Sequence, residues 1–453
     1  MTSQPSALLR LPEDHPGLAI ARAVAAQGGR ALVVGGWVRD RLLGSEGGSD
    51  DVDLEVFGLA PEVLEAVLGD FGRVRRVGRT FPIYQVGGLS MDVSAASSRN
   101  FAEAARRRDL RINAIGWDPL TGALEDPHDG QSDLASGTLS AVDAAHFGDD
   151  PLRGLRTVQL AARLEMTLDA ELRSLCVATD LDSMPAERVF AEWKRILLRA
   201  PRPSVALTLL QELGLLRFFP ELEALIGVPQ DPEWHPEGDV WVHTGRVVDQ
   251  AAQLRQNQDE DRDLLLMFGA LCHDLGKPGT TEERDGRIVS RKHSEKGLEP
   301  TRVFLERLRA PGWLVTGVVA LVRHHLAPAQ FVRDSDAAGA KAYRKLARRL
   351  AEAGIDFELL YRVARADHLG RTTADARAGS FAVGDRFLER ARAIDAEPAT
   401  HEPAVTGRHL LALGIEPGPE MGALLARCLD IQDETGWSDP EPILARALAA
   451  PGG

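Results

Sequence analysis

The pattern of apolar and polar residues divides the chain into a strand-rich first third and a helical remainder. Residues 31–34 form a short apolar run that ends at a glycine pair, which predicts a buried strand followed by a tight turn. Residues 52–57 alternate, so that apolar side chains occupy one face of a strand and acidic side chains the other. Further short strands are predicted at residues 73–77, 83–86, 89–93 and 112–117.

Helical periodicity surrounds and follows these strands. Residues 37–43 predict the opening of a helix that stops at Gly44, and residues 15–27 predict an amphipathic helix. From about Pro151, Leu, Ala and Arg recur at three- and four-residue spacing, which is typical of packed amphipathic helices. The first of these helices are predicted at residues 153–164, 170–181, 187–198 and 204–213.

The composition is that of a globular protein with an ample core. A chain of 453 residues suffices for several domains, and 44% hydrophobic with 26% charged residues is ordinary for a soluble fold. No apolar run approaches the roughly 20 residues that a membrane helix needs, so we expect no membrane partner. The first 17 residues also lack the pattern of a secretory signal. Cys176, Cys272 and Cys428 are isolated, which favours free thiols and a cytoplasmic location.

The charge of the chain is negative overall but uneven. A net charge of −14 argues against a generally basic nucleic-acid-binding protein. Between residues 71 and 115, however, arginines outnumber acidic residues by six, which predicts either a solvated surface or salt-sensitive contacts with RNA phosphates. These arginines are at positions 73, 75, 76, 79, 99, 106, 107, 108 and 111.

The candidate chemistry of the strand-rich part centres on a glycine pair and an acidic strand. Gly35 and Gly36 allow backbone N–H groups to approach a phosphate, and the helix that starts beside them favours the same anion. Asp51 and Asp53 point the same way from one strand, which suits Mg²⁺ because this ion binds through one or two carboxylates and substrate phosphates. Each signal alone also occurs in ordinary turns and solvated strands. Together they predict a phosphoryl or nucleotidyl transferase.

Four ordered motifs resemble the class II tRNA nucleotidyltransferases, or CCA-adding enzymes, and the bacterial poly(A) polymerases of the polymerase-β superfamily. The motifs are GGWVRD at 35–40, DVDLEVFG at 51–58, RRDLRINA at 107–114 and DPLRGLR at 150–156. The resemblance implies a mixed sheet with helices and two Mg²⁺ ions held by Asp51 and Asp53. It also implies that the enzyme adds nucleotides to an RNA 3′ end.

The same resemblance assigns roles to further residues of this region. The nucleotide phosphates would lie on Gly35, Gly36 and Arg39. Asp92 would support the catalytic carboxylates electrostatically, and Arg108 and Asp109 would also bind nucleotide. Asn113, by contrast, is expected to make structural hydrogen bonds.

The incoming base would be selected on one helix by Asp150, Arg153 and Arg156, again by resemblance. An Asp–Arg pair three residues apart also forms ordinary salt bridges at helix ends. Two departures from the family pattern leave the selectivity open between CTP and ATP. Asp149 stands where the family usually has Glu, and Gln159 stands where an arginine is frequent.

The connection from Asp92 to Arg108 is only about fifteen residues long. In many members of the family it is longer and holds a flexible loop that the final A addition requires. The sequence therefore predicts an enzyme that adds CMP, AMP or both to the tRNA 3′ end, with a CC-adding enzyme as one form of this hypothesis. The alternative within the fold is a poly(A) polymerase that uses ATP alone.

A second constellation of His and Asp residues follows in the helical part. Both residue types are ligands of divalent metals, and His273-Asp274 beside a Gly-Lys turn resembles the HD phosphohydrolase superfamily. By this resemblance the metal ligands are His243, His273, Asp274 and Asp367. Phosphate contacts or a second metal are expected at Lys277, His293 and His324.

An HD site of this kind would hold Mn²⁺, Ni²⁺ or Co²⁺ and hydrolyse phosphoesters, including 2′,3′-cyclic phosphates at RNA ends. An HD domain kept only for packing is the alternative, as is an HD hydrolase whose N-terminal part merely binds nucleotide. The chain is thus expected to hold an α/β polymerase-β-like head, an all-α neck, an HD domain and a helical tail that contacts tRNA or simply caps the fold. We place these four parts at residues 1–145, 146–225, 226–380 and 381–453.

Overall fold

The computed structural model divides the chain into two compact units, Met1–Met184 and Pro185–Gly453. It describes residues 9–44, 52–77, 83–89, 91–96, 98, 100–333, 339–395 and 402–449. Asp51, predicted as a metal ligand, lies outside the described residues. The break after Met184 falls within the predicted neck, so the division into four parts stays a prediction.

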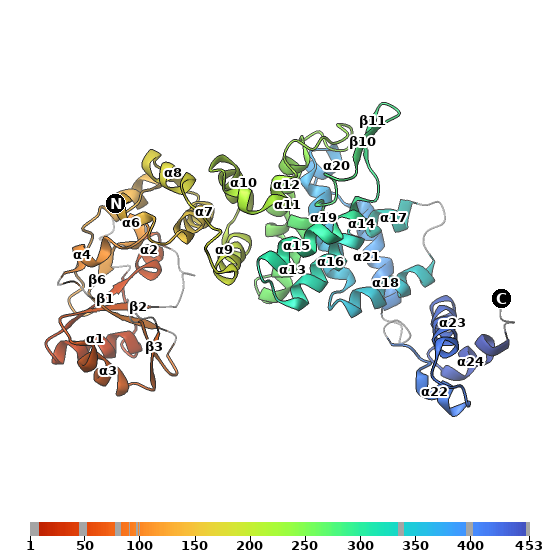
Figure 1. The fold of residues 1–453 in the computed structure, drawn as a ribbon, viewed down its shortest axis with the longest axis horizontal. Coiled ribbons are helices and arrows are strands. Elements are labelled where there is room, and N and C mark those ends of the chain that lie inside the picture. Colours follow the sequence, from red (N-terminus) through yellow and green to blue (C-terminus); the bar gives the residue numbers. More distant parts are fainter. Residues whose placement is uncertain are drawn as a thin grey trace. The chain divides into compact units, whose positions relative to one another are not determined.

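The first unit is built on a mixed seven-stranded sheet with the order β3-β4-β5-β2-β1-β6-β7 (Figure 1). The strands β2 and β5 pair in parallel, and the other neighbours in this sheet pair antiparallel. The strands are β1 (Arg30–Val34), β2 (Asp53–Phe57), β3 (Val74–Val77), β4 (Ile83–Val86), β5 (Asp92–Ala95), β6 (Gly116–Trp117) and β7 (Leu124–Glu125), with a separate pair β8 (Thr138–Leu139) and β9 (Thr167–Leu168).

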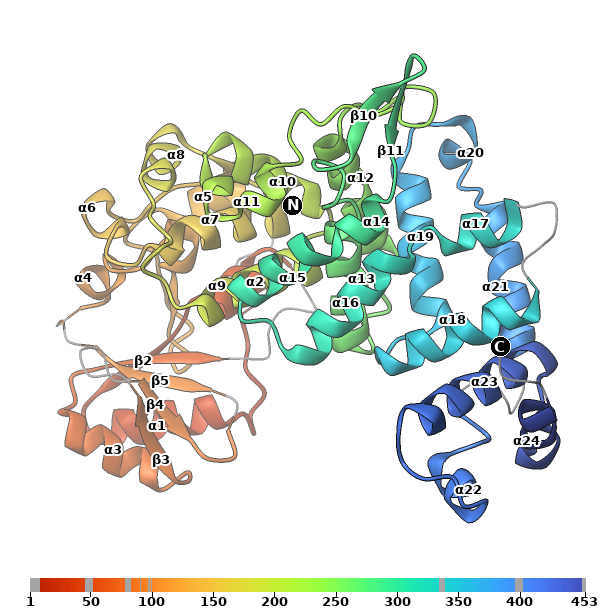
Figure 2. The ribbon, with the colours of Figure 1, turned by 45° about the vertical axis from the view of Figure 1, so that its right-hand side comes forward.

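Helices flank this sheet, and two of them, α1 and α3, cover one of its faces (Figure 2). The helices of the unit are α1 (Pro16–Ala26), α2 (Gly36–Leu42), α3 (Pro61–Gly69), α4 (Phe101–Ala105), α5 (Gly130–Ser136), α6 (Ala144–Phe147), α7 (Leu152–Leu164) and α8 (Ala170–Val177), with a 3-10 turn η2 (Arg111–Asn113). The predicted α/β head is confirmed.

Both faces of the central strand β1 are buried, as its continuous apolar run predicts. Val33 packs into the core beneath α1 and α3, whereas Leu32 and Val34 pack on the other side with Phe101 of α4. In β2 the alternation also holds, because Leu54 belongs to the first core and the acidic side chains lie on the opposite face.

Two predicted strands differ from the structure. The strand expected at 89–93 begins later, because Gly87 and Gly88 form a turn and β5 runs from Asp92 to Ala95. Much of the run 112–117 is not a strand: it contains the turn η2 followed by the two-residue strand β6. Asn113 accounts for this turn, since its backbone N–H bonds to the carbonyl of Leu110 at 2.9 Å and its side chain bonds to Asp109.

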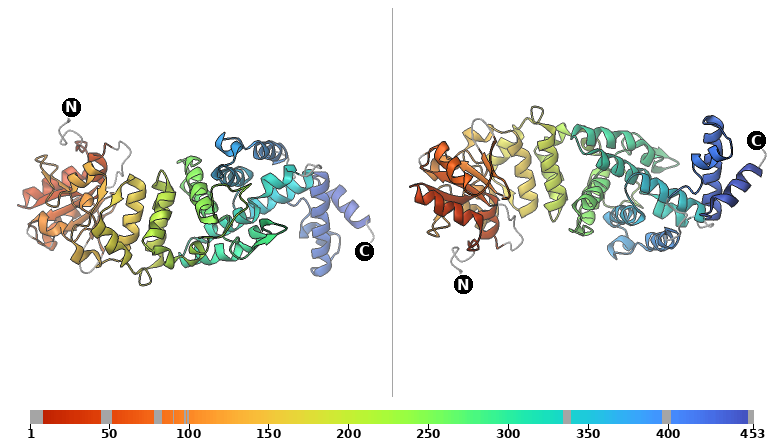
Figure 3. Two further views of the ribbon diagram at one scale, coloured as in Figure 1. Left: turned by 90° about the horizontal axis from the view of Figure 1, so that it is seen from above. Right: turned by 90° about the horizontal axis from the view of Figure 1, so that it is seen from below.

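The second unit is almost entirely helical, and Figure 3 shows this for the part coloured from green to blue. Its helices are α9 (Ala186–Arg199), α10 (Pro203–Glu212), α11 (Pro220–Glu223), α12 (Val240–Gln253), α13 (Glu260–Cys272), α14 (His293–Lys296), α15 (Leu298–Arg307), α16 (Gly312–His324), α17 (Ala327–Arg333), α18 (Ala340–Glu352), α19 (Phe357–Gly370), α20 (Ala374–Arg377), α21 (Ala382–Asp395), α22 (Gly407–Ala412), α23 (Pro419–Thr435) and α24 (Pro440–Ala449), with a 3-10 turn η3 (Leu215–Phe218). The strands β10 (Thr281–Arg284) and β11 (Arg287–Ser290) form one hairpin.

An aspartate precedes the first turn of each of three helices, α12, α13 and α19, which hold or directly precede predicted metal ligands. Asp239 before α12, Asp259 before α13 and Asp356 before α19 each accept a hydrogen bond from a backbone N–H of the first turn, at 2.9 to 3.0 Å. The helices α12 and α19 also approach closely, because a Cβ on Gly370 would lie 2.5 Å from a methyl of Val247. Local sequence thus fixes where these helices begin and how near they lie.

Within the described residues, each helix is too short or too polar to cross a bilayer. The three cysteines are free and buried, and burial raises the pKa of the Cys176 thiol to about 12. The free thiols predicted from the isolated positions of the three cysteines are therefore confirmed.

The close approach of α14 to the loop after α13 makes Gly276→Ala a test of packing. A Cβ at Gly276 would lie 2.0 Å from the carbonyl oxygen of His293 and 2.5 Å from the nitrogen of Gly297, and backbone atoms cannot yield as a flexible side chain can. We expect the second unit to lose about 1–3 kcal/mol of stability, measured by urea denaturation followed by circular dichroism. Gly279→Ala is the matched control, because nothing lies within 4 Å of its Cβ. Equal stability of both variants would contradict this packing.

Candidate functional sites

The glycine bend of the first unit lies beside the acidic strand. Gly35 has a φ of 78°, which favours glycine, and it places Gly36 at the start of α2. A Cβ on Gly35 would lie 3.6 Å from Oδ2 of Asp53 and 3.7 Å from Nη1 of Arg108. The structure therefore brings the predicted phosphate bend, one predicted metal ligand and one predicted nucleotide-binding arginine together.

Asp53 and Asp92 are neighbours across the sheet. The parallel register pairs Leu54 with Val93, so the preceding aspartates also lie side by side, on the face opposite the core that holds Leu54 and Val93. Both line an open cleft of about 860 Å³. The cleft also contains Arg73, Arg75 and Gln85, and the amide of Gln85 donates to Asp92 at 3.3 Å. Adjacent carboxylates open to solvent are the oxygen ligands that suit Mg²⁺.

A buried polar network links the predicted nucleotide-binding residues. Arg39 donates to the side-chain oxygen of Asn113 at 2.6 Å, and the amide of Asn113 donates to Asp109 at 3.0 Å. Arg156 of α7 reaches the other oxygen of Asp109 at 3.3 Å. Burial alone would raise the pKa of Asp109, but the charge of Arg156 and the Asn113 bond outweigh it and hold the pKa below its usual value. The network thus joins α2, η2 and α7 into one frame.

Three further ion pairs hold this frame. Arg39 and Arg163 both contact the buried carboxylate of Asp40, at 2.7 and 2.8 Å, and Arg108 pairs with Glu55 at 2.7 Å. These partners could not be read from motif spacing, because Arg163 lies 123 residues after Asp40. Only the alternation of β2, which places Glu55 on the acidic face, gave a signal for one of them.

The predicted base-selecting residues lie at the start of α7. Asp150 accepts a hydrogen bond from the N–H of Leu152 at 3.1 Å, as a residue before a helix often does. Arg153 donates to the backbone carbonyls of His146 and Arg107. Gln159 is buried in α7, so it takes part in packing. Their role toward a base stays a prediction.

The second unit brings all four predicted HD ligands together. His243 of α12, His273 and Asp274 after α13, and Asp367 of α19 are buried within one cluster. Nε2 of His243 lies 3.1 Å from Asp367, and Nε2 of His273 lies 3.1 Å from Asp274 and 4.0 Å from Asp367. Ligand atoms of His243, His273 and Asp274 fall within 4.8 Å of one another, close enough to hold one ion.

A second group of possible ligands shares Asp274. It consists of Asp274, His293 and His325, with 3.2 Å between the Nε2 atoms of the two histidines. The sequence predicts His324 at this position, whereas the structure places His325 in the group. Adjacent residues on a helix point about 100° apart, since a turn holds 3.6 residues, and α16 directs His325 into the cluster. The charged groups that influence His324 are instead Arg349 and Arg323.

The charges of the cluster suit a divalent ion. Burial alone would raise the pKa of Asp274, but His273 and Lys277 hold it well below its usual range. Burial lowers the pKa of His325 to about 3, so this imidazole stays neutral, as a metal ligand must. Nε2 of His273 and Oδ2 of Asp274 are buried and lie 3.1 Å apart, and Oδ2 also lies 2.7 Å from the ammonium of Lys277, but neither atom makes a well-aligned hydrogen bond in the described part of the chain. These residues therefore fit a metal.

Lys277 lies at the mouth of this cluster. Its ammonium contacts Asp274 and the side-chain oxygen of Gln230, each at 2.7 Å. It also lines a pocket of about 800 Å³ with His293, His325 and Asp367. Its contact with a phosphate stays a prediction. The sequence motifs identify His243 but give no signal for Glu237, which accepts a hydrogen bond from Nδ1 of that histidine.

Comparison with known proteins gives three family profiles along the chain. The profile described as the poly A polymerase head domain matches residues 83–140. One described as the probable RNA and SrmB-binding site of polymerase A matches residues 175–226. The HD domain profile matches residues 240–372, which contain the whole histidine and aspartate cluster.

Similar proteins span most of the chain. The multifunctional CCA protein of Stenotrophomonas maltophilia is 36% identical over 323 residues, covering 66% of this chain and 76% of that protein. The multifunctional CCA protein of Halorhodospira halophila is 36% identical over 319 residues, covering 65% and 72%.

Solved structures share the fold. The Bacillus stearothermophilus CCA-adding enzyme in complex with CTP superposes with a TM-score of 0.66 at 22% identity, covering 96% of this chain and 97% of the other. The Thermotoga maritima CCA-adding enzyme complexed with tRNA gives a TM-score of 0.59 at 18% identity, covering 99% of each chain. By its sequence relatives and its paired head and HD domains, the chain belongs to the family of class II CCA-adding nucleotidyltransferases.

Proposed function

We propose that the first unit adds CMP and AMP to the 3′ end of tRNA, using CTP and ATP. The observation that carries this proposal is the convergence of Gly35, Asp53 and Arg108 beside Asp92 at one open cleft. Relatives named multifunctional CCA proteins support the substrate. The buried free cysteines and the tRNA substrate support a cytoplasmic location.

The residues of the cleft have different roles in nucleotidyl transfer. The glycine bend receives the triphosphate and Arg108 compensates its negative charge, while Arg39, buried against Asp40 and Asn113, positions the bend. The terminal ribose oxygen bonds to the α-phosphorus, the α–β phosphoanhydride bond breaks, pyrophosphate leaves, and the hydroxyl proton passes to solvent. Asp51 and Asp53 would hold Mg²⁺, which supplies positive charge to the phosphates when bound, and Asp92 would support these carboxylates electrostatically.

Base selection is assigned to the start of α7. Asp150 offers a carboxylate oxygen, and Arg153 and Arg156 offer N–H groups, so that together they can present an acceptor and donors to a base edge. Arg156 is already positioned by Asp109 and Arg153 by two backbone carbonyls. A rigid set of this kind favours CTP and ATP without a nucleic-acid template.

We also propose that the HD cluster is a metal-dependent phosphohydrolase. A divalent transition metal such as Mn²⁺, Ni²⁺ or Co²⁺ would be held by His243, His273, Asp274 and Asp367, and a second by His293 and His325 with Asp274. When bound, it makes water a better nucleophile. In a 2′,3′-cyclic phosphate, water oxygen would bond to phosphorus, one ester bond would break, and the released ribose oxygen would take up a proton. Lys277 would contact the phosphate.

The first test is the identity of the added nucleotides. Pure protein is incubated with tRNA lacking CCA, CTP and ATP, and the extended 3′ ends are sequenced. We expect CCA, because Asp150, Arg153 and Arg156 can serve both bases. Ends that stop at CC would favour the CC-adding hypothesis raised by the short connection from Asp92 to Arg108. Addition of A alone, on diverse RNA, would favour a poly(A) polymerase.

The second test removes the carboxylate at the glycine bend. Asp53→Asn should lower CMP incorporation at least about 100-fold, since preorganised charge at the reacting phosphates is lost. Asp70→Asn, the same change at an exposed residue after α3, should leave incorporation unchanged. Unimpaired incorporation by the Asp53 variant, measured with labelled CTP, would refute the assignment.

The third test uses the adjacent histidines at the end of α16. His325→Asn should weaken Mn²⁺ binding at least about 10-fold and abolish phosphate release from 2′,3′-cyclic AMP. His324→Asn should change neither, because its ring lies outside the ligand group. Mn²⁺ binding is followed by titration calorimetry. The reverse order of effects would restore His324 as the ligand, and wild-type protein that binds no Mn²⁺, Ni²⁺ or Co²⁺ would refute the hydrolase proposal.

A further inference from the structure

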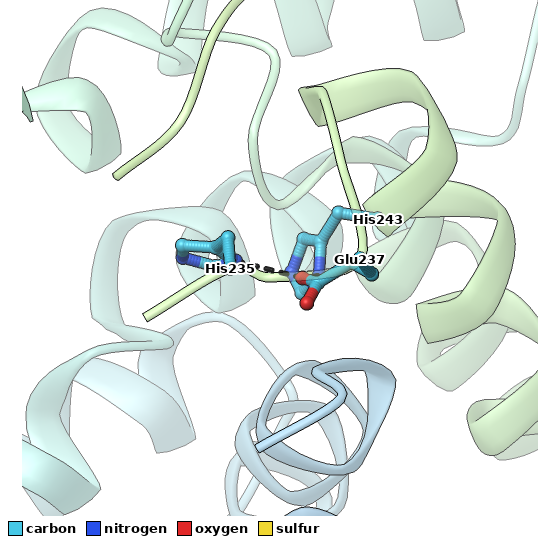
Figure 4. Close-up of side chains that lie close together, drawn as sticks. All are labelled: His235, Glu237 and His243. Atoms are coloured by element: carbon cyan, nitrogen blue, oxygen red, sulfur yellow. Dashed lines mark hydrogen bonds and ion pairs between the residues drawn. The ribbon is translucent and has the colours of Figure 1, made fainter. Parts of the chain in front are cut away.

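One buried carboxylate, Glu237, lies directly behind the HD ligand His243. Its Oε1 accepts hydrogen bonds from Nδ1 of His235 at 2.9 Å and from Nδ1 of His243 at 2.8 Å (Figure 4). Its Oε2 accepts from the backbone N–H of Thr372 at 3.1 Å. All three side chains come from one segment, the loop before α12 and the first turn of that helix, whereas Thr372 follows α19.

The surroundings keep this carboxylate ionised and fixed. Its side chain is only 1% exposed, and that of His243 is fully buried. Burial alone would raise the pKa of Glu237, but the hydrogen bonds from His235 and His243 outweigh it and hold the pKa well below its usual value. A buried anion with three N–H donors has little freedom to turn, because each donor would lose its partner.

These bonds decide which nitrogen of His243 carries the proton. Glu237 is an acceptor only, so Nδ1 of His243 must be the N–H, and in the neutral ring Nε2 keeps its lone pair. That lone pair points toward Asp367, 3.1 Å away, and toward His273 and Asp274. Two acceptors so close repel each other unless a proton or a metal ion lies between them. Nε2 is thus prepared for a cation.

We propose that Glu237 is a positioning residue of the HD site, which fixes His243 as an Nε2 metal ligand. This inference rests on the proposed metal-binding function of the cluster. Carboxylates behind metal-bound histidines set the ring orientation and raise the basicity of the ligand atom. Through Thr372, five residues after Asp367, Glu237 also ties the end of α19 to α12 and so holds two ligands at a set separation.

The group His235, Glu237 and His243 could instead hold a metal of its own. The distances disfavour this reading, because metal–nitrogen and metal–oxygen bonds are about 2.0–2.2 Å and would require the three side chains to surround an ion. Here the nitrogens point at a single oxygen at hydrogen-bond distance. The stoichiometry of binding separates the two possibilities.

The first experiment measures Mn²⁺ affinity of the full chain by titration calorimetry. Glu237→Gln should bind Mn²⁺ about 10- to 100-fold more weakly than the wild type at unchanged stoichiometry. Glu233→Gln is the matched control: it removes the same charge at an exposed residue that lines the pocket beside the cluster, where Glu233 pairs with Arg287. Equal affinity of the Glu237 variant and the wild type would overturn the inference. Loss of one Mn²⁺ equivalent, with the remaining affinity unchanged, would assign a separate metal to the three side chains and overturn it too.

The second experiment needs no metal and no variant of Glu237. In protein with ¹⁵N-labelled histidine, the signals of His243 are identified by their loss in His243→Asn. We expect the Nδ1–H tautomer in the metal-free wild type, and the Nε2–H tautomer would overturn the inference. Wild-type protein that binds no Mn²⁺, Ni²⁺ or Co²⁺ would refute the hydrolase proposal and, with it, the role of Glu237 toward a metal. The Nε2–H tautomer in protein that does bind metal would overturn the inference alone, so the two failures are distinguishable.

Discussion

Both units of this chain depend on one constraint, which is that every buried carboxylate must be compensated by positive charge or by hydrogen bonds. Removing an ionised carboxylate from water costs several kcal/mol, at the order-of-magnitude level, unless charges and hydrogen bonds replace the lost hydration. Asp274 is the clearest case, because it is 2% exposed and lies within contact distance of His273, Lys277 and His293. A site built this way holds the partners of its carboxylate in place before any substrate arrives.

The first unit meets the same constraint with arginines. Asp40 is enclosed by Arg39 and Arg163, and Asp109 by Arg156 and a bonded amide. These pairs join helices and turns that are far apart in the sequence, and they leave the cleft-lining face of β2 and β5 to carry the exposed carboxylates. The frame is rigid because its charges are paired and buried, whereas the reacting groups lie where phosphates and hydrated Mg²⁺ can reach them.

Sequence patterns predicted the elements that depend on local chemistry. The buried strand at 31–34, the bend at Gly35 and the helices after Pro151 follow from hydrophobic runs, glycine and periodicity, and the structure contains them. The late start of β5 could not be read in the same way, since it depends on the register with β2 and the turn at Gly87. The sequence also could not decide between His324 and His325, because packing determines which side of α16 faces the cluster. Glu237 could not be predicted either, because no sequence spacing marks a carboxylate that hydrogen-bonds to a metal-ligand histidine.

The two sites also differ in the ligand atoms they offer, and this difference follows from where each lies in the fold. The edge of β2 and β5 presents oxygen ligands in an open cleft, which suits a hydrated, hard ion that arrives with the nucleotide. The helical cluster presents imidazole nitrogens and two buried carboxylates, a donor set that suits Mn²⁺, Ni²⁺ or Co²⁺ without a substrate phosphate as a further ligand. On the proposed functions, nucleotide addition and ester hydrolysis would lie in separate units, and each would use the ion that its own ligand atoms suit.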